Sequence, residues 1–87
     1  MPQRKARIAK EVKTAFSAYL YELRSAAGWS LRDLSASSGI GHNHLWLYEH
    51  GRRVPRLHTL VLLSRAFEMP LYRFLRPLDA LGLPWKS

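Results

Sequence analysis

The sequence predicts an all-α domain of five helices, and two observations support this. In most stretches, apolar residues recur three or four positions apart, the spacing that places them on one face of a helix. Glycine and proline residues separate these stretches, and both residue types are typical of helix ends. Eighty-seven residues suffice for one domain with one core, and a hydrophobic content of 47% is ordinary for a folded chain.

The N-terminal segment, residues 1–7, is a basic leader that contains Arg4, Lys5 and Arg7 together with Pro2, a poor helix residue. We interpret it as a frayed, solvated terminus. The alternative is an arm that lies along phosphate groups, as basic segments beside a binding domain commonly do.

A long amphipathic helix is predicted to begin near Ile8 and to end before Gly28. Its apolar residues keep the helical spacing throughout; they are Ile8, Val12, Phe16, Tyr19, Leu20, Leu23 and Ala27.

The next helix is predicted to begin after Ser30 and to last about two turns. Ser30 and Asp33 have the spacing of a capping box, in which each side chain bonds a free backbone amide of the other residue. Gly39 can adopt the left-handed conformation that closes a helix C-terminus. Ile40 is then predicted to turn inward, so that the two helices around it are joined by a tight turn.

A short helix follows, with Gly41 as its N-cap, His50 near its end and Gly51 beyond it. Leu45 and Tyr48 share its inner face, and four residues point outward: His42, Asn43, His44 and Leu47. Two short helices joined by a glycine turn, with hydrogen-bonding side chains on the outer face of the second, are typical of a helix-turn-helix.

The rest of the chain contains a basic loop, two helices and an apolar tail. The loop carries Arg52, Arg53 and Arg56. A helix is predicted from Arg56 or Leu57, with core residues at helical spacing: Leu57, Leu60, Leu63, Ser64 and Phe67. A fifth helix covers residues 71–75, so the domain spans residues 8–76. The tail, residues 77–87, is expected to cover this domain or a second subunit with its apolar side chains, which are Leu78, Leu81, Leu83 and Trp85.

Charge and composition limit the function classes. The net charge of +8 and the sequence pI near 10.7 favour a polyanionic partner, although they suit RNA or an acidic membrane surface as well as DNA. There is no cysteine, which fits a reducing compartment and excludes a thiolate zinc site. No apolar run approaches the ~20 residues of a membrane span, and the first residues lack the apolar region of a signal peptide. We therefore expect a soluble, cytoplasmic protein.

The run GWSLRDLSASSGIGHNHLWLYEHGRRVP resembles the Cro and phage-repressor type of helix-turn-helix domain, the Xre-like family. Its landmarks include the capped helix, the glycine turn and then Glu49, Gly51 and Pro55 at the family's spacing. The resemblance extends from about Phe16 to Leu75 and implies a compact five-helix, lambda-repressor-like domain, here with an extended first helix. It also implies a regulator of transcription that binds double-stranded DNA, with the helix over residues 41–50 in the major groove.

The resemblance assigns roles to individual residues. Those that match base-contacting positions are His42, Asn43, His44 and Leu47. Those expected to contact the DNA backbone are Arg32, Arg52, Arg53 and Arg56. Arg24 and Glu49 match a pair that joins the first helix to the end of the recognition helix. Because one recognition helix reads few base pairs, we expect a homodimer on DNA.

Two departures from the family pattern leave a second hypothesis open. Leu31 stands where many members have a glutamine that reaches a phosphate, and Trp46 and Leu47 stand where polar residues are usual. The alternative is a protein-interaction module, such as an antitoxin-like or assembly subunit, that binds its partner through Trp46, Leu47 or the tail.

Other chemistry has little support in the sequence. The spacing of His42 and His44 directs them to different sides of a helix, and without cysteine no zinc set is complete, so no metal or cofactor is expected. There is no nucleophile, base and acid at a recognisable spacing and no glycine-rich phosphate loop before a helix. An enzyme is therefore not expected.

Overall fold

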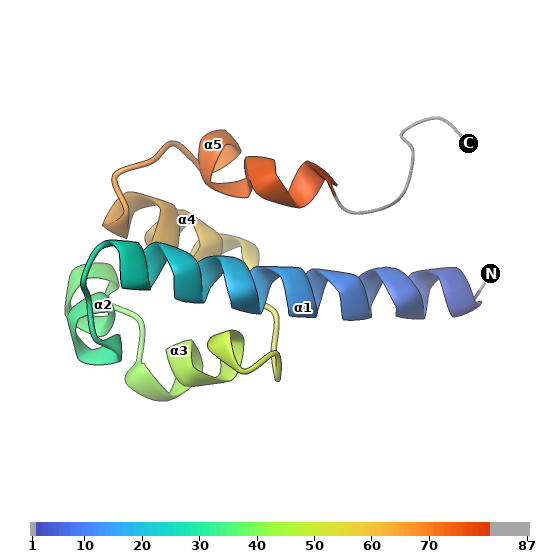
Figure 1. Ribbon diagram of the computed structural model, residues 1–87, viewed down its shortest axis with the longest axis horizontal. Helices are drawn as coiled ribbons and strands as arrows, with labels where there is room; N and C mark the ends of the chain where they lie inside the picture. Colours follow the sequence, from blue (N-terminus) through green and yellow to red (C-terminus); the bar gives the residue numbers. More distant parts are fainter. Residues whose placement is uncertain (1, 81–87) are drawn as a thin grey trace.

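The structure is a computed structural model that describes the backbone of residues 2–80 and the side chains of residues 5–79. Its five α-helices are α1 (Pro2–Ala26), α2 (Leu31–Ser38), α3 (His42–Glu49), α4 (Leu57–Ala66) and α5 (Leu71–Leu75), and a 3-10 helix, η1 (Arg76–Ala80), follows them (Figure 1). No strand occurs between residues 2 and 80. The prediction of an all-α domain with five helices is confirmed.

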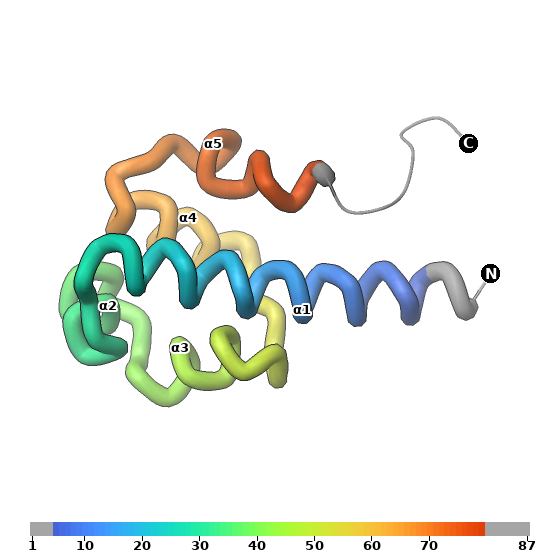
Figure 2. Tube along the Cα trace, in the orientation of Figure 1, coloured from blue at the N-terminus to red at the C-terminus, as the bar shows by residue number. Residues whose placement is uncertain are grey.

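Helix α1 begins six residues earlier than the predicted start near Ile8, at Pro2. Proline is well accepted in the first turn of a helix, where an amide hydrogen would have no partner, and the alanine, lysine and arginine residues that follow are good helix formers. Figure 2 shows that this part of α1 extends beyond the other helices, which accounts for a long axis of 41 Å against 24 and 22 Å.

Only the C-terminal part of α1 is packed. Phe16 and Leu20 are buried, whereas Ile8 is 36% exposed and Ala27 lies beyond the helix end on the surface. The helical spacing of Ile8 and Ala27 therefore does not correspond to burial at either end of the stretch. Ile8 lies in the part of α1 that extends beyond the other helices (Figure 2).

Helix α2 and the turn after it are held by short-range hydrogen bonds. Asp33 accepts a bond from the Ser30 amide at 2.8 Å, and the Asp33 amide donates to Ser30 Oγ at 3.1 Å, which is the predicted capping box. Gly39 adopts a left-handed conformation with φ of 77° and closes the helix. Ser38 then bonds both Leu34 O and the Ile40 amide, which turns Ile40 into the core.

The core receives a large side chain from every α-helix. Six side chains are almost completely buried: Phe16, Leu20, Leu34, Leu45, Leu63 and Phe74. Helix α3 packs along α1, and α2 contacts both α3 and α4. This arrangement fixes the helix-turn-helix on a rigid support.

Helix α4 differs from the prediction in one position. Leu57, expected in the core, is 69% exposed, and Thr59 is buried. Leu57 is the first residue of α4, so its side chain lies at the edge of the bundle, and the buried stripe starts with Thr59. After the helix, Glu68 has a left-handed backbone with φ of 57°, which is unfavourable for a residue with a side chain.

The chain after α5 returns to the first helix. Element η1 contacts α1, and Leu78 packs against the core. The other apolar residues of the tail, Leu81, Leu83 and Trp85, lie outside the described residues.

Candidate nucleic-acid interface

Helix α3 presents one buried side and one accessible side. Leu45 is fully buried and Tyr48 is 6% exposed, because both pack into the core. His42, Asn43 and His44 are exposed on the first turn, and Leu47 is half-buried one turn later. The inner face is confirmed, and the polar side chains of the first turn are accessible to a partner.

The four residues assigned to base contacts fall into two groups. His42, Asn43 and Leu47 line one shallow hollow, together with Trp46. His44 instead lines a recess between α3 and α4. The structure therefore brings three of the four together on one surface and turns His44 toward a different neighbour.

The centre of this surface is aromatic. Trp46 is 42% exposed, and the imidazole of His50 stacks on its indole with ring centres 3.8 Å apart. His50 Nδ1 also lies 2.8 Å from Trp46 O, which holds the imidazole in place. The stacking of His50 on Trp46 was not predicted from the sequence. Its spacing of four residues from Trp46 was the available signal, since residues at i and i+4 are neighbours on a helix.

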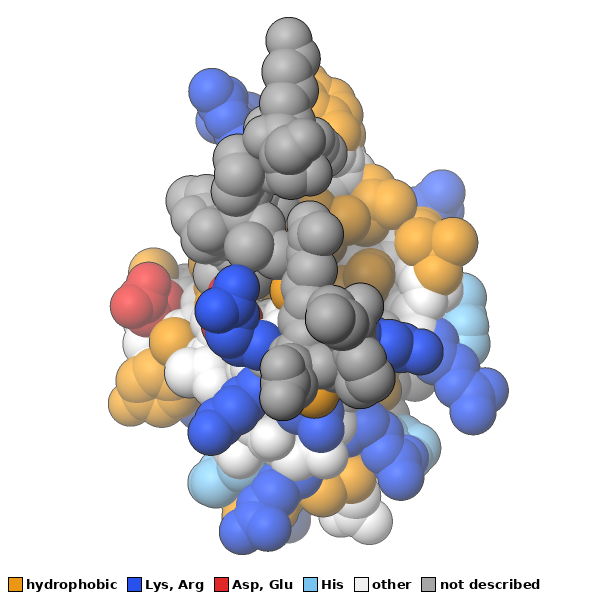
Figure 3. Space-filling view, turned by 90° about the vertical axis from the view of Figure 1, so that its right-hand side faces the viewer, with side chains coloured by type: hydrophobic (Ala, Val, Ile, Leu, Met, Phe, Trp, Pro, Cys, Tyr) orange, Lys and Arg blue, Asp and Glu red, His pale blue; other side chains and the backbone are white. Residues whose placement is uncertain are grey.

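Arginine side chains lie on both sides of α3. Arg32 is exposed on α2 and borders a hollow with His42, at the start of α3. Arg52, Arg53 and Arg56 are exposed in the loop that follows α3. Figure 3 shows Lys and Arg side chains gathered on the lower half of the molecule, the half in which α3 lies, whereas the acidic side chains in that view are at one side. This surface is suited to a polyanion.

The loop after α3 leaves the helix in a defined direction. Gly51 has φ of 66°, and the Arg52 amide donates to Leu47 O at 2.9 Å. Pro55 is buried and anchors the other end of the loop. The three arginines are thus carried by a loop whose two ends are fixed.

A charged pair joins α1 to the end of α3. Arg24 Nε and Nη2 donate to the two carboxylate oxygens of Glu49 at 2.6 and 2.9 Å, and Nη1 donates to Trp29 O at 2.8 Å. The hydrogen bonds that Arg24 donates to Glu49 raise the pKa of the guanidinium, so it stays charged. The Arg24 and Glu49 side chains are only 15% and 3% exposed. Two-point bonding of this kind fixes orientation as well as distance.

The histidines do not gather into a metal site. Within the residues that the structure describes, no group of three or more His, Cys, Asp or Glu side chains is placed to hold an ion.

None of the helices between Pro2 and Ala80 combines the length and the apolar character needed to cross a membrane.

Residues 15–83 match a family of helix-turn-helix domains, and this match includes all of α2 and α3 and the packed part of α1. No curated protein matches the chain.

Proposed function

The chain belongs to the helix-turn-helix domain family, and on that premise we propose that it is a transcriptional regulator that binds specific sequences in double-stranded DNA. Helix α3 would lie in the major groove, and the protein would act in the cytoplasm without catalytic activity. The observation that carries the proposal is the accessible first turn of α3, which presents Asn43 and His42. Arg32 lies near the start of α3, and three arginines follow its end.

Asn43 is the main candidate for base recognition. Its amide can donate to adenine N7 and accept from the adenine amino group, and this two-point contact distinguishes adenine from the other bases. His42 and His44 can donate to guanine N7 or to phosphate, and Leu47 can pack against a thymine methyl group. The chemistry of these side chains matches groups that are present in the major groove.

The arginines on both sides of α3 would contact phosphates. Arg32 is placed near the start of α3, and Arg52, Arg53 and Arg56 follow its end. Such contacts set the orientation of the helix on the duplex without reading its sequence. We further propose that residues 8–76 are the DNA-binding domain and that it binds as a homodimer to half-sites about 10 to 10.5 base pairs apart.

Selection of bound oligonucleotides from a random pool tests the proposal. The wild-type chain is expected to enrich one motif. Asn43→Ala is expected to relax the preference at one base position, at about 1 to 3 kcal/mol of discrimination, while affinity for random duplexes is nearly unchanged. Failure of the wild-type chain to enrich any motif would contradict sequence-specific binding.

One observation supports a second function. Trp46 is 42% exposed and lines the hollow with His42, Asn43 and Leu47, and an exposed indole is a frequent anchor of protein interfaces. The chain would then be a protein-interaction module that keeps the fold. Light scattering together with oligonucleotide selection separates the two, because an interaction module would bury Trp46 and Leu47 against another chain and would select no DNA motif.

A further inference from the structure

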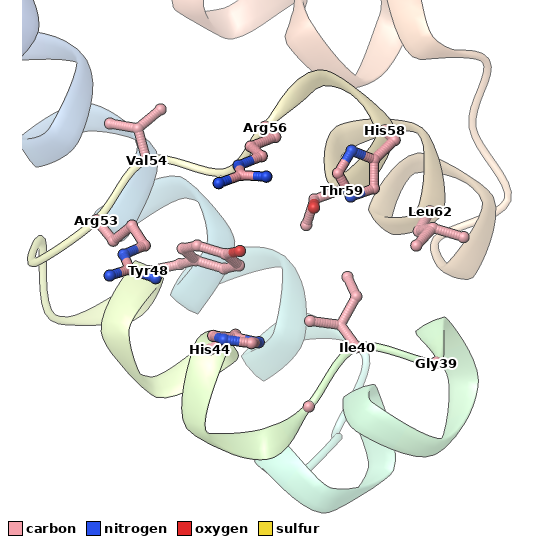
Figure 4. Close-up of a pocket in the computed structure, with 11 residues that line it drawn as sticks. Gly39, Ile40, His44, Tyr48, Arg53, Val54, Arg56, His58, Thr59 and Leu62 are labelled. Atoms are coloured by element: carbon pink, nitrogen blue, oxygen red, sulfur yellow. The ribbon is translucent and has the colours of Figure 1, made fainter.

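We propose that the recess between α3 and α4 binds a small organic anion, a phosphate or carboxylate group on an apolar body, and that this ligand competes with DNA. The recess has a volume of about 660 Å³ and is formed by α3, the loop after it and the first turns of α4 (Figure 4). Small-molecule sites in proteins have volumes of about 300 to 1,000 Å³. The competition with DNA rests on the proposed function, whereas the binding of the anion does not.

Two hydroxyl groups in the recess have no hydrogen-bond partner among the described residues. Tyr48 is 6% exposed and Thr59 is 7% exposed, yet neither hydroxyl forms a hydrogen bond with another described residue. Because no described buried polar atom is left without a partner, both hydroxyls must be open to the recess. Figure 4 shows them turned toward the space between α3 and α4. Both hydroxyls are therefore free to form hydrogen bonds with an occupant of the recess.

The charge of the recess favours an anion. Arg53, Arg56, His44 and His58 line it, and none of the described residues around it is acidic. Figure 4 shows Arg56, from the loop after α3, and Tyr48, from α3, among the side chains that line the recess. The guanidinium of Arg56 and the hydroxyls of Tyr48 and Thr59 are all hydrogen-bond donors, as an anion requires.

The start of α4 adds backbone donors at the same place. Arg56 is the N-cap of this ten-residue helix, and its side chain forms no capping bond. The Leu60 amide is the first to find its acceptor, Arg56 O, so the amides of Leu57, His58 and Thr59 have no acceptor within the helix. Free amides and the helix dipole together stabilise negative charge at a helix N-terminus.

The remaining walls define the other part of the ligand. Ile40, Val54 and Leu62 contribute apolar surface, and the recess is too large for a phosphate or carboxylate group alone. An anionic group at the start of α4, joined to an apolar or aromatic body against these side chains, would satisfy both the polar and the apolar lining.

This position links the ligand to DNA binding. His44 and the two arginines of the recess are also residues proposed to contact DNA. A bound anion would neutralise the same side chains that a phosphate of the duplex needs, so occupancy would weaken duplex binding. The recess would thereby make the DNA affinity depend on a metabolite.

Binding can be measured without DNA, with phenyl phosphate as the probe and inorganic phosphate as the anion alone. In the isotope-labelled full chain, phenyl phosphate is expected to shift the amide signals of Gly41, His58 and Thr59 saturably and to bind more tightly than inorganic phosphate. Tyr48→Phe keeps the buried ring and removes one hydroxyl, which should weaken binding of phenyl phosphate about tenfold or more. Tyr72→Phe is the matched control, because Tyr72 is 77% exposed and does not line the recess, and it should leave binding unchanged.

The second measurement is a competition between phenyl phosphate and a labelled DNA duplex. Phenyl phosphate should release the duplex from the wild-type chain, and Tyr48→Phe should require a roughly tenfold higher concentration. Three results would overturn the proposed site: no saturable shift, equal affinity for inorganic phosphate, or unchanged binding by Tyr48→Phe. If the duplex binds while the titration with phenyl phosphate stays flat, the recess serves only the DNA backbone. If phenyl phosphate binds and no duplex does, the ligand site stands and the proposed function fails.

Discussion

Removing Arg24 or Glu49 should destabilise the fold, and the loss of Arg24 should cost more free energy of unfolding than the loss of Glu49. The pair connects α1 to the end of α3 through two hydrogen bonds, and Arg24 makes a third bond to Trp29 O. Arg24→Ala removes all three bonds and leaves the Glu49 carboxylate, whose side chain is 3% exposed, without this partner. Glu49→Ala leaves a guanidinium that keeps its bond to Trp29 O and can turn toward solvent.

The magnitude follows from burial. Breaking a buried ion pair by removing one partner costs about 3 to 5 kcal/mol, whereas an exposed pair contributes about 0.2 to 1 kcal/mol. The Glu49 side chain is almost completely buried, so the cost of Arg24→Ala should be that of a broken buried ion pair, about 3 kcal/mol. Arg24 is 15% exposed, so Glu49→Ala should cost less, about 2 kcal/mol, and still more than an exposed pair.

Urea denaturation followed by circular dichroism measures these differences, and the double variant completes a mutant cycle. Arg7→Ala is the control, because Arg7 and Glu11 form an exposed pair at 3.9 Å and its loss should change the free energy of unfolding by less than about 0.5 kcal/mol. The reasoning is refuted if Glu49→Ala has the same free energy of unfolding as the wild type. It is also refuted if the losses of the two single variants sum to the loss of the double variant, since this would mean that the two residues do not interact.

Three further predictions concern the loop, a strained residue and a helix cap. Arg52→Ala should reduce the slope of log affinity against log salt by about one, for random and selected duplexes alike, with Arg65→Ala, an exposed arginine near the end of α4, as the control. Unchanged affinity would show that Arg52 does not contact the backbone. Glu68→Gly should stabilise the fold by about 1 kcal/mol in thermal unfolding, because glycine accepts the left-handed conformation without strain; a loss of stability would contradict this. The Ser30 amide lowers the pKa of Asp33, so the contribution of Asp33 to stability is present above its unfolded pKa and is lost as the pH falls through its folded pKa. Urea midpoints measured on acidification should therefore fall less steeply for Asp33→Asn, and identical pH profiles would argue against the cap.

Features that depend on neighbouring residues were predictable from the sequence. The capping box of Ser30 and Asp33 and the left-handed Gly39 arise from chemistry within a few residues, and the structure has both. The inner face of α3 also followed from spacing, because Leu45 and Tyr48 are three positions apart and share one side of a helix.

Features that depend on distant elements were not predictable in this way. Ile8 keeps the apolar spacing of α1, but it is exposed because it lies in the part of α1 that extends beyond the other helices (Figure 2). Leu57 was assigned to the core by spacing alone, although its place at the first residue of α4 turns it to the surface. His44 was grouped with Asn43 because both point outward, and only the position of α4 shows that His44 lines another recess.

The length of α1 has a consequence for hydrogen exchange. Residues 5–10 are exposed on all sides of the helix, so their backbone bonds can open while the bundle stays folded. A helical stretch this short is only marginally stable in water without tertiary contacts. Near Phe16 and Leu20 the same helix is buried, and opening it requires much of the core to open as well. Amide protons along this one helix should therefore exchange with deuterium in two groups, fast at the N-terminal end and slow beside the core, with the boundary close to Val12.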